Sequence, residues 1–599
     1  MQLTDFESAH NLVRLFLDRA DELGERPFLV ARRDGAWQAL SWREAAEQVC
    51  LLAEALRSLG LEDGDRVVIV AENRPEWAIA DLAIMAAGCI TTPAYTTNTE
   101  RDHLHILENS GAKAVIVSSR KLAQPLLPAI VRSGIADHVI GIEPLPAVQG
   151  SFACHAWGDL VRGDASAARQ AVDARIAGIG RRDPACIIYT SGTSGAPRGV
   201  LLHHGAILRN VDGAARVLAG DFGWDEERFL SFLPLSHALE HTAGLFLPVG
   251  LGADIWFAEG LDKLSANIEE ARPTFMVVVP RLFEMMRGRI VKQVESQGKI
   301  ANFVLDQALA LAERRAAGQR RLTDWAVERL LDVTVRPKIR QRFGGRIKAL
   351  VSGGAPLNPE VGAFFEAMGL VMLQGYGQTE AAPVVSVNHP SAEVNLSTVG
   401  PPLKGVEVRI ADDGEILVRG ELVMLGYWQN EAETAKTIVD GWLHTGDIGH
   451  FDEAGRIVIT DGKKDIIVND KGDHIAPQKL EGMLTLQPEI AQAMVSGDKR
   501  PYVVGLIVPD PEWTCEWAQA NVEKFDMAEL QKLPAYRSAV REAIDRVNQD
   551  LSVTEKVRQF AFADEAFTID NGMMTPSMKI RRGPIRERYG KRLDALYKG

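Results

Sequence analysis

The stretch YTSGTSGAPRGV, residues 189–200, is crowded with residue types that bind anions. Its glycines let backbone N–H groups turn inward without a side-chain clash, while hydroxyls and one guanidinium add further donors. The anion-binding residues would be Thr190, Ser191, Gly192, Thr193, Ser194, Gly195 and Arg198. The combination is typical of a loop that holds phosphate groups. It is not the Walker pattern G-x-x-x-x-G-K-[ST], because Pro197 stands at the second glycine and no Lys-Ser or Lys-Thr follows.

A buried strand is predicted just before this loop, because residues 186–189 form the apolar run CIIY. The loop would then leave the carboxyl end of that strand, which is where α/β proteins bind ligands. Gly/Ser-rich stretches are also common in mobile surface loops. Composition alone therefore leaves both interpretations open.

A second candidate segment, LQGYGQTE at residues 373–380, also follows an apolar run. Tyr376 can stack on a flat base, and Glu380 supplies the hard oxygen that Mg²⁺ prefers beside phosphate groups. The segment begins like the dinucleotide-binding pattern G-x-G-x-x-G, but Glu380 replaces the last glycine, so that interpretation fails. A nucleotide contact and a structural turn both remain as interpretations.

Two further segments each contain one residue suited to bind part of a nucleotide or an acid. Asp447, in GWLHTGDIG at residues 441–449, can accept hydrogen bonds from a ribose diol, and an Asx-turn is the alternative. Lys579, in NGMMTPSMKIRR at residues 571–582, can reach a phosphate or a carboxylate as a point charge. The alternative for Lys579 is an ordinary surface lysine.

Two other segments match known motifs but lack the surroundings that those motifs need. HALEH at residues 237–241 fits the zinc-peptidase pattern H-x-x-E-H. Pro234 favours a loop over a helix interior there, and no third ligand is evident, so we do not expect zinc. DFG at residues 221–223 copies a kinase triplet without the H-R-D loop or glycine-rich loop of a kinase, and we treat it as a coincidence.

The elements that would position these residues can be predicted from the alternation of apolar and amphipathic stretches. Residues 41–60 form one amphipathic stretch, and the apolar runs lie at residues 66–73, 113–119, 185–192, 273–280 and 347–354. Alternation of this kind predicts an α/β fold with parallel sheets covered by helices. Residues from about 297 to 345 are charged and helix-forming, which indicates a helical insertion that serves packing rather than chemistry.

The pattern changes after about residue 400. Residues 406–428 alternate, with turns at Asp413–Gly414 and Arg419–Gly420, which predicts a β-rich subdomain of antiparallel strands at about 400–460. We place a domain boundary in the polar stretch TDGKKD, residues 460–465. The predicted organisation is a large domain over residues 1–462 and a small α+β domain over residues 463–599.

Composition narrows the class of protein. The 599 residues are 46% hydrophobic and 25% charged, which is ordinary for a globular protein, and the net charge of −13 does not favour a nucleic-acid partner. Five scattered cysteines without a C-x-x-C pair indicate a reducing compartment, with neither a disulfide framework nor a zinc cluster. The first residues are acidic where a signal peptide needs bases, and no apolar run reaches the about 20 residues of a spanning helix.

We therefore expect a cytoplasmic protein. The basic stretch at residues 579–599, KIRRGPIRERYGKRLDALYKG, is either a solvated face or a peripheral contact with the inner face of a membrane.

Five segments, in the order in which they occur, resemble the motifs of the adenylate-forming, or AMP-binding, superfamily of acyl-CoA synthetases, luciferases and peptide-synthetase adenylation domains. They are YTSGTSGAPRGV, LPLSHALEH, QGYGQTE, GWLHTGDIG and PSMKIRR. The resemblance covers about residues 10–595, and the chain length and helical insertion are most similar to long-chain fatty acyl-CoA synthetases. It implies two half-reactions. ATP and a medium- or long-chain fatty acid give acyl-AMP and pyrophosphate, and coenzyme A then takes the acyl group.

The resemblance also implies a role for each motif. Thr190 and Glu380 would hold Mg²⁺, His237 would lie near the acyl carboxylate, and Lys579 would contact that carboxylate and the α-phosphate. Asp447 would bind the ribose. The residues that would bind ATP are Thr190, Ser191, Gly192, Thr193, Ser194, Gly195, Arg198, Gly354, Ala355, Pro356, Gln374, Gly375, Tyr376, Gly377, Thr379, Asp447 and Lys579.

Movement of the small domain is part of what the resemblance implies. Lys464 matches the hinge about which the carboxyl-terminal domain of this superfamily rotates as a lid. The rotation would withdraw Lys579 and bring the loop around Gly472 towards the thiol.

Two positions depart from the pattern of the superfamily. Arg198 stands where the phosphate loop ordinarily ends in Lys, and since the charge is kept we expect a modest effect. Gly462 stands where an Arg that grips the nucleotide is ordinary, and glycine removes that cation. We predict weaker ATP binding than in a relative that has the Arg.

Alternatives to the ligase remain at this stage. One is an acyl-AMP ligase that delivers to a carrier-protein thiol. Another is a relative that binds nucleotide or lipid with weakened turnover, suggested by Gly462. The sequence leaves the preferred acid and the oligomeric state open.

Overall fold

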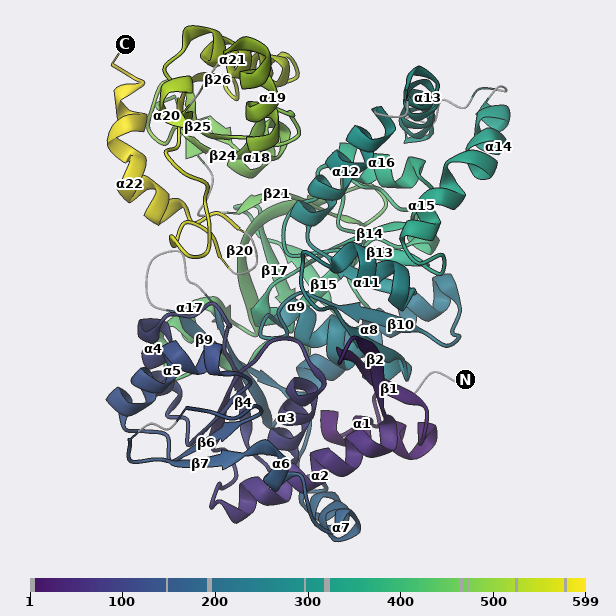
Figure 1. Cartoon of the computed structure of the whole chain (residues 1–599), viewed down its shortest axis with the longest axis vertical. Coiled ribbons are helices and arrows are strands. Elements are labelled where there is room, and N and C mark those ends of the chain that lie inside the picture. Colours follow the sequence, from purple (N-terminus) through teal and green to yellow (C-terminus); the bar gives the residue numbers. More distant parts are fainter. Residues whose placement is uncertain are drawn as a thin grey trace.

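The computed structural model describes residues 6–146, 149–190, 197–295, 298–316, 321, 324–462, 467–471, 473–522, 526–575 and 579–598. Within these residues the chain forms two eight-stranded sheets, a smaller antiparallel sheet and a separate carboxyl-terminal unit (Figure 1). The predicted α/β fold, with parallel sheets, a β-rich part and a small α+β unit at the carboxyl end, is confirmed.

The first sheet is mostly parallel and is covered by helices on both faces. Its strands are β3 (Arg66–Val70), β4 (Ile90–Pro93), β5 (Ala114–Val117), β6 (His138–Gly141), β7 (Ala153–Ala156), β8 (Pro184–Thr190), β9 (Arg198–His203) and β18 (Gly426–Tyr427). Their order is β18-β9-β8-β4-β3-β5-β6-β7, and only β9 and β18 run antiparallel to their neighbours. The helices in this part are α2 (Trp42–Ser58), α3 (Pro75–Ala86), α4 (Glu100–Ser110), α5 (Arg120–Ser133), α6 (Trp157–Leu160) and α7 (Ala165–Ile176).

The central strand β3 shows why this sheet is buried on both faces. Val67 and Ile69 pack into the core shared with α2 and α3, whereas Val68 and Val70 pack against α4 and α5. A strand buried on both sides needs a continuous apolar run, and this is the pattern of the sequence.

The second sheet contains the other predicted apolar runs. Its strands are β1 (Pro27–Arg33), β2 (Ala36–Ser41), β10 (Arg228–Ser231), β11 (Asp254–Phe257), β12 (Phe275–Val278), β13 (Ala349–Ser352), β14 (Met372–Gly377) and β15 (Val384–Val387), in the order β15-β14-β13-β12-β10-β11-β1-β2. The helices and helical turns are α1 (Leu12–Leu23), α8 (His204–Phe222), α9 (Ala238–Glu240), η1 (His241–Phe246), α10 (Leu247–Leu251), α11 (Leu264–Ala271), α12 (Pro280–Glu295), α13 (Lys299–Ala316), α14 (Asp324–Thr334), α15 (Arg336–Arg342), α16 (Pro359–Ala367), η2 (Thr379–Ala381) and η3 (Pro390–Ala392).

The segment predicted as a helical insertion contains α13, α14 and α15. Leu305 and Leu311 of α13 and Leu331 of α14 pack into a core that includes Phe364 and Phe365 of α16. These helices therefore cover one face of the second sheet.

The β-rich part is antiparallel throughout. It comprises β16 (Glu407–Ile410), β17 (Glu415–Arg419), β19 (Ile438–Val439), β20 (Trp442–Phe451), β21 (Ile457–Gly462) and the helix α17 (Glu431–Thr437). The predicted turn at Asp413–Gly414 joins β16 to β17, and Gly414 has a φ of 83°, a conformation that favours glycine.

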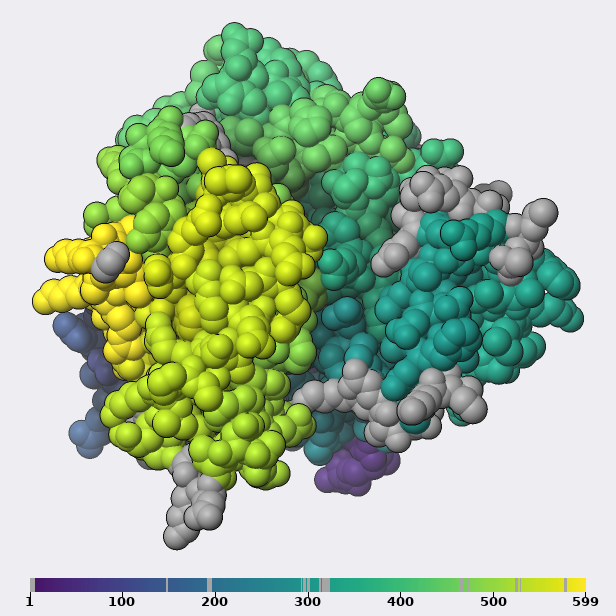
Figure 2. Space-filling view, turned by 90° about the horizontal axis from the view of Figure 1, so that it is seen from above, coloured from purple at the N-terminus to yellow at the C-terminus, as the bar shows by residue number. Residues whose placement is uncertain are grey.

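The carboxyl-terminal unit has its own core. Its elements are β22 (Ile467–Val468), β23 (His474–Ile475), α18 (Pro477–Leu484), β24 (Ile490–Ser496), β25 (Val503–Pro509), α19 (Pro511–Asn521), α20 (Met527–Leu530), α21 (Pro534–Gln549), β26 (Val557–Phe562) and α22 (Arg582–Ala595). The buried ring of Tyr536 packs against Trp513, Trp517 and Phe562. Seen from above, this unit lies over the large part of the chain (Figure 2).

Candidate active site

The predicted phosphate loop connects two neighbouring strands of the first sheet. Thr190 ends β8 and pairs with Arg198, the first residue of β9, so the two described ends of the loop lie side by side. The Thr190 hydroxyl is 3.5 Å from the Arg198 carbonyl oxygen. The intervening residues predicted to bind phosphate, Ser191, Gly192, Thr193, Ser194 and Gly195, lie outside the described residues. His105 of α4 contacts the carbonyl oxygen of Pro197 through Nε2 at 2.8 Å and so anchors the exit of the loop.

Arg198 is held by two groups that are distant in the sequence. Its guanidinium donates to the carboxylate of Glu433 in α17 and lies 4.9 Å from the ring centroid of Tyr427 in β18. Arg198 and Glu433 are both half-buried, so their pair is partly shielded from solvent. The cation that closes the phosphate loop is therefore oriented by the β-rich part of the chain.

Glu380 belongs to the same network. It lies in η2, directly after β14, and its Oε1 accepts a hydrogen bond from the Tyr427 hydroxyl at 2.8 Å. Burial and then the negative charge of Glu380 raise the pKa of Tyr427, so the hydroxyl keeps its proton. Tyr427 thus joins Glu380 to Arg198, and Arg198 leads back to Thr190. The two residues predicted to hold a metal ion are thus linked through Tyr427 and Arg198.

Tyr376 and Asp447 meet at the other end of the site. The Tyr376 hydroxyl donates to Asp447 Oδ2 at 2.7 Å, and Asp447 in β20 pairs across the sheet with Gly462 in β21. Burial, followed by the charge of Asp447, raises the pKa of Tyr376 well above its ordinary value. Glu380 adds to this effect, which indicates that the two ends of the site are electrostatically connected.

The residues predicted to line the adenine lie on neighbouring strand ends. Gly354, Ala355 and Pro356 follow β13, and Ser352 of that strand pairs with Gln374 of β14. The side-chain oxygen of Gln374 is buried and accepts no hydrogen bond within the described residues, so it is available to a ligand amino group. Thr379 is half-buried beside Glu380 in η2.

The packing or backbone conformation of the protein favours glycine at three positions of these segments. A Cβ on Gly377 would lie 1.9 Å from the Pro383 carbonyl oxygen, and one on Gly375 would lie 3.3 Å from the Ser386 carbonyl oxygen. Gly354 has a φ of 82°, which strains any other residue. The close packing of β14 against β15 therefore requires Gly377 whether or not a nucleotide binds.

The charge of Lys579, in the carboxyl-terminal unit, acts on His237, in the large part of the chain. His237 caps α9, and its Nδ1 accepts a hydrogen bond from the Leu239 N–H at 3.2 Å. Burial, and to a smaller extent the positive charge of Lys579, lowers the pKa of His237 to about 4. His237 is therefore neutral at pH 7, and Lys579 supplies the cation at this point.

The backbone around Lys579 is fixed by its own turn. The Lys579 N–H donates to the Thr575 hydroxyl at 3.0 Å, and the Thr575 N–H donates to the Lys579 carbonyl oxygen at 2.7 Å. The carboxyl-terminal unit is held over the large part by Arg281 of α12, which donates to the Ala491 carbonyl oxygen, and by Leu486, which packs on the core beneath α12.

The HALEH segment corrects one expectation. Residues 238–251 are helical, as α9, η1 and α10, because Pro234 precedes the helix and His237 caps it, so the predicted loop is wrong. The three polar side chains have separate partners: His241 pairs with Asp81 at 2.8 Å, and Glu240 accepts from the Ser231 hydroxyl at 2.6 Å. Burial raises the pKa of Glu240 to about 8. Among the described residues, no group of three or more His, Cys, Asp or Glu is placed to hold a metal ion.

The DFG triplet ends α8, where Gly223 is the C-cap with a φ of 71°. Asp221 accepts hydrogen bonds from His389 and Ser391. The triplet thus connects α8 to the loop after β15.

Several neighbours of the site could not be identified from motifs. Tyr427 is part of the short run GYW, and Glu433 belongs to no motif. Ser352 Oγ and Gln378 Nε2 are buried without a hydrogen-bond partner within the described residues. Ser352 is the polar last residue of the apolar strand β13, and this is a signal that the sequence offers. Gln378 lies directly after β14 and caps η2, within the segment LQGYGQTE.

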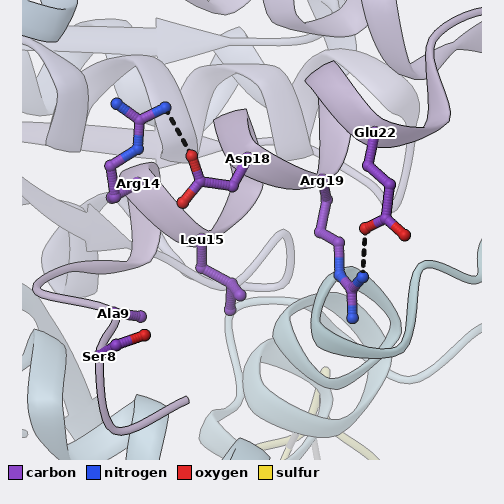
Figure 3. Close-up of a pocket in the computed structure, with 7 residues that line it drawn as sticks. All are labelled: Ser8, Ala9, Arg14, Leu15, Asp18, Arg19 and Glu22. Carbon is purple, nitrogen blue, oxygen red and sulfur yellow. Dashed lines mark hydrogen bonds and ion pairs between the residues drawn. The ribbon is translucent and has the colours of Figure 1, made fainter. Parts of the chain in front are cut away.

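A shallow hollow beside α1 contains none of the predicted site residues (Figure 3). Its charged side chains pair with one another, Arg14 with Asp18 at 2.8 Å and Arg19 with Glu22 at 2.6 Å. The charged side chains of this hollow are thus engaged in ion pairs within α1.

Known families match almost the whole chain. Residues 16–428 match the family described as AMP-binding enzyme, and residues 464–599 match the AMP-binding enzyme C-terminal domain. Among curated relatives, the long-chain-fatty-acid–CoA ligase FadD15 of Mycobacterium bovis is 35% identical over 571 residues, covering 94% of this chain and 93% of that protein. Long-chain-fatty-acid–CoA ligase 1 of Homo sapiens is 29% identical over 605 residues, covering 95% of this chain and 84% of that protein.

A solved structure supports the fold independently. The adenylation domain of a carboxylate reductase from Mycobacterium chelonae superposes with a TM-score of 0.76 at 21% identity, covering 99% of this chain and 92% of that chain. The similarity concerns the fold alone.

Proposed function

The chain belongs to the AMP-binding enzyme family and is an adenylate-forming enzyme, and from that premise we propose that it is a medium- or long-chain fatty acid–CoA ligase. In the first step a carboxylate oxygen of the acid attacks the α-phosphorus of ATP. The bond to the bridging oxygen breaks, and pyrophosphate leaves with that electron pair. In the second step the thiolate sulfur of coenzyme A attacks the acyl carbonyl carbon, the bond from that carbon to the phosphate oxygen breaks, and AMP leaves with its electron pair.

The phosphate end of the site suits ATP. Arg198 would attract the β- and γ-phosphates, and without ATP its guanidinium is paired with Glu433 at the exit of the loop. Thr190 and Glu380 are the residues that would hold Mg²⁺, which supplies positive charge to the departing pyrophosphate. A half-buried carboxylate and a hydroxyl fit this ion, which is commonly bound by few protein oxygens together with substrate phosphates.

The nucleoside part of ATP would be bound by Tyr376, Asp447 and Gln374. The Asp447 carboxylate would accept hydrogen bonds from the ribose hydroxyls while Tyr376 orients it. The buried Gln374 oxygen would accept from the adenine amino group. Gly354, Ala355 and Pro356 would form the wall against which the base lies.

The electrostatic effect of Lys579 on His237 carries the proposal, since a cation of the carboxyl-terminal unit would then act where a carboxylate would react. Neutral His237 can position the acid without competing for the negative charge. Lys579 would stabilise the charge that develops on the α-phosphate and the attacking carboxylate during adenylation.

The later step would require the carboxyl-terminal unit to rotate. The proposed domains are residues 1–462 and 463–599, with the hinge at Lys464 and the thiol-facing loop around Gly472. Lys464 and Gly472 lie outside the described residues. We also propose a cytoplasmic location, which suits coenzyme A as the acceptor.

A panel of carboxylic acids of graded length, scored for AMP release with and without coenzyme A, tests the proposal. Acceptance of long acids, with release that depends on coenzyme A, is the expected result. Acyl-hydroxamate formation without thioester formation would favour a carrier-protein thiol as the acceptor in place of coenzyme A. The same assay with a carrier protein would then measure that activity. If no acid in the panel gives either acyl-hydroxamate or AMP, the enzyme assignment is contradicted.

A further inference from the structure

The helix α14 presents its apolar side chains to solvent. Trp325, Leu330 and Val333 are 71%, 49% and 69% exposed. At 100° per residue they share one face with the exposed Ala326 and Arg329, within about 140° of arc. The helix lies at the outer edge of the molecule, to the right in Figure 1. An outward face of this composition is unusual for a helix that belongs to the surface of a soluble domain.

The inward face of α14 is equally informative. Leu331 is buried in the core, Val327 packs against it, and Asp324 pairs with Arg314 of α13 at 2.7 Å. Asp332, at the border of the two faces, pairs with Arg336 at 2.8 Å. Asp324 and Asp332 are thus paired with arginines of the protein, although the Asp332 side chain is 58% exposed. The exposed apolar side chains of α14 share their face with one arginine, Arg329.

The surroundings of this face are basic in a chain that is acidic overall. Residues 321–346 contain seven basic and three acidic side chains, while the whole chain carries a net charge of −13. Arg321 and Lys338, near the two ends of α14, are both exposed. An apolar strip with a tryptophan, bordered by cations, is complementary to an anionic lipid surface, since indole rings favour the headgroup region and cations favour the lipid charge.

The basic carboxyl-terminal stretch is less suited to this role. Arg582 pairs with Glu481, Arg592 with Asp564 and Asp594 with Arg500, all within the carboxyl-terminal unit. The apolar side chains of α22 face inward, where Ile585, Tyr589 and Leu593 are buried. Among the described residues from 579 to 598, none is a large apolar side chain with a high exposed fraction.

We propose that the exposed face of α14, formed by Trp325, Ala326, Arg329, Leu330 and Val333, is a docking surface for an anionic lipid membrane. At 1.5 Å per residue its 11 residues span about 16 Å, which suits a helix lying in the plane of the interface. Within the described part of the chain, no helix has the length and apolarity needed to cross a bilayer. The proposal does not depend on the ligase activity.

The test is co-sedimentation of the full-length protein with vesicles of phosphatidylcholine, alone or mixed with phosphatidylglycerol in equal parts. The double variant Trp325→Ser/Val333→Ser should bind the mixed vesicles at least about tenfold more weakly. Val553→Ser is the matched control, because Val553 is 73% exposed on the other unit, and its binding should equal that of the wild type. Arg329→Glu should weaken binding about fivefold at low salt and much less at high salt.

Two measurements keep the result interpretable. Circular dichroism and acyl-AMP formation from a short soluble acid should be unchanged in all variants, since no substituted residue belongs to the predicted site. Wild-type protein that ignores both kinds of vesicle would overturn the proposal. So would a double variant that keeps its vesicle binding but changes from dimer to monomer in sedimentation velocity, because the face would then be a contact between two copies of the chain.

Discussion

The phosphate end and the ribose end of the predicted nucleotide site are built differently. At the phosphate end, Arg198 is paired with Glu433, and Glu380 accepts from Tyr427, so charges from three elements support one another. At the ribose end, Asp447 accepts from Tyr376 and faces Gly462, which has no side chain. The first end therefore contains a pair of opposite charges, whereas at the second end the carboxylate is paired across the sheet with a glycine.

This difference bears on the prediction that Gly462, in place of an arginine, weakens ATP binding. Half-buried charges cost free energy unless they are paired, and a phosphate loop cannot be left uncompensated when ATP is absent. The ribose is neutral, so the absence of an arginine at position 462 leaves less uncompensated charge than the absence of a cation at the phosphate end would. The following predictions measure how unequal the two ends are.

Replacement of Lys579 by Ala should have the largest effect, because in the proposed mechanism this cation acts on the reacting atoms between the two ends. We expect acyl-AMP formation to fall by at least about 100-fold, the usual cost of losing one group that stabilises developing charge. Acyl-hydroxamate release measures it. Lys591→Ala is the matched control, since Lys591 is an exposed lysine of α22. A Lys579→Ala enzyme with the wild-type rate would remove Lys579 from the mechanism.

Asp447→Ala should come next. Loss of charge-assisted hydrogen bonds to the ribose costs about 1.5–3 kcal/mol, so we expect the KM for ATP to rise about 10- to 100-fold. The rise in KM should depend on the presence of both ribose hydroxyls in the nucleotide. Wild-type enzyme should prefer ATP over 2′-deoxy-ATP, and the variant should lose most of this preference. If the variant still discriminates fully, Asp447 does not bind the ribose. Tyr376→Phe, which removes only the orienting hydroxyl, should have a smaller effect.

Gly462→Arg should improve the ribose end. A guanidinium opposite Asp447 would add one charge-assisted contact to the nucleotide, which predicts a KM for ATP about three- to tenfold lower. Gly462→Ala is the control, because it removes the freedom of glycine without adding charge. An unchanged KM in Gly462→Arg would show that the missing cation is not what limits ATP binding.

Much of the fold could be predicted because it depends on short-range patterns. A run such as RVVIV predicts a strand buried on both faces, and such strands occur in parallel sheets covered by helices. The two-residue strand β18 could not be predicted, since two residues carry no periodicity. At HALEH the prediction of a loop from Pro234 is wrong. A proline disfavours helix in the residues before it, but the residues after His237 are free to form a helix.

Some residues of the candidate site could also be predicted from local sequence, and others could not. Motifs could mark Thr190, Glu380, Asp447 and Lys579, because each lies in a distinctive local sequence. The pair of Arg198 with Glu433 joins residues 235 positions apart and depends on how β18 and α17 are placed beside β9. The outward apolar face of α14 could not be predicted either, since periodicity identifies an apolar face without saying which face is covered.

Glu433→Gln should have the smallest effect and tests whether the protein's own pairing at the phosphate end competes with ATP. Glu433 shares the Arg198 guanidinium, so its neutralisation should leave more of that charge for the phosphates. A half-exposed ion pair contributes about 0.2–1 kcal/mol, so the KM for ATP should fall about two- to threefold. The fall should vanish in the Arg198→Gln background, because the carboxylate then has no cation to share. A rise in KM would mean instead that Glu433 positions Arg198 for ATP, and the phosphate end would then owe its strength to orientation rather than to free charge.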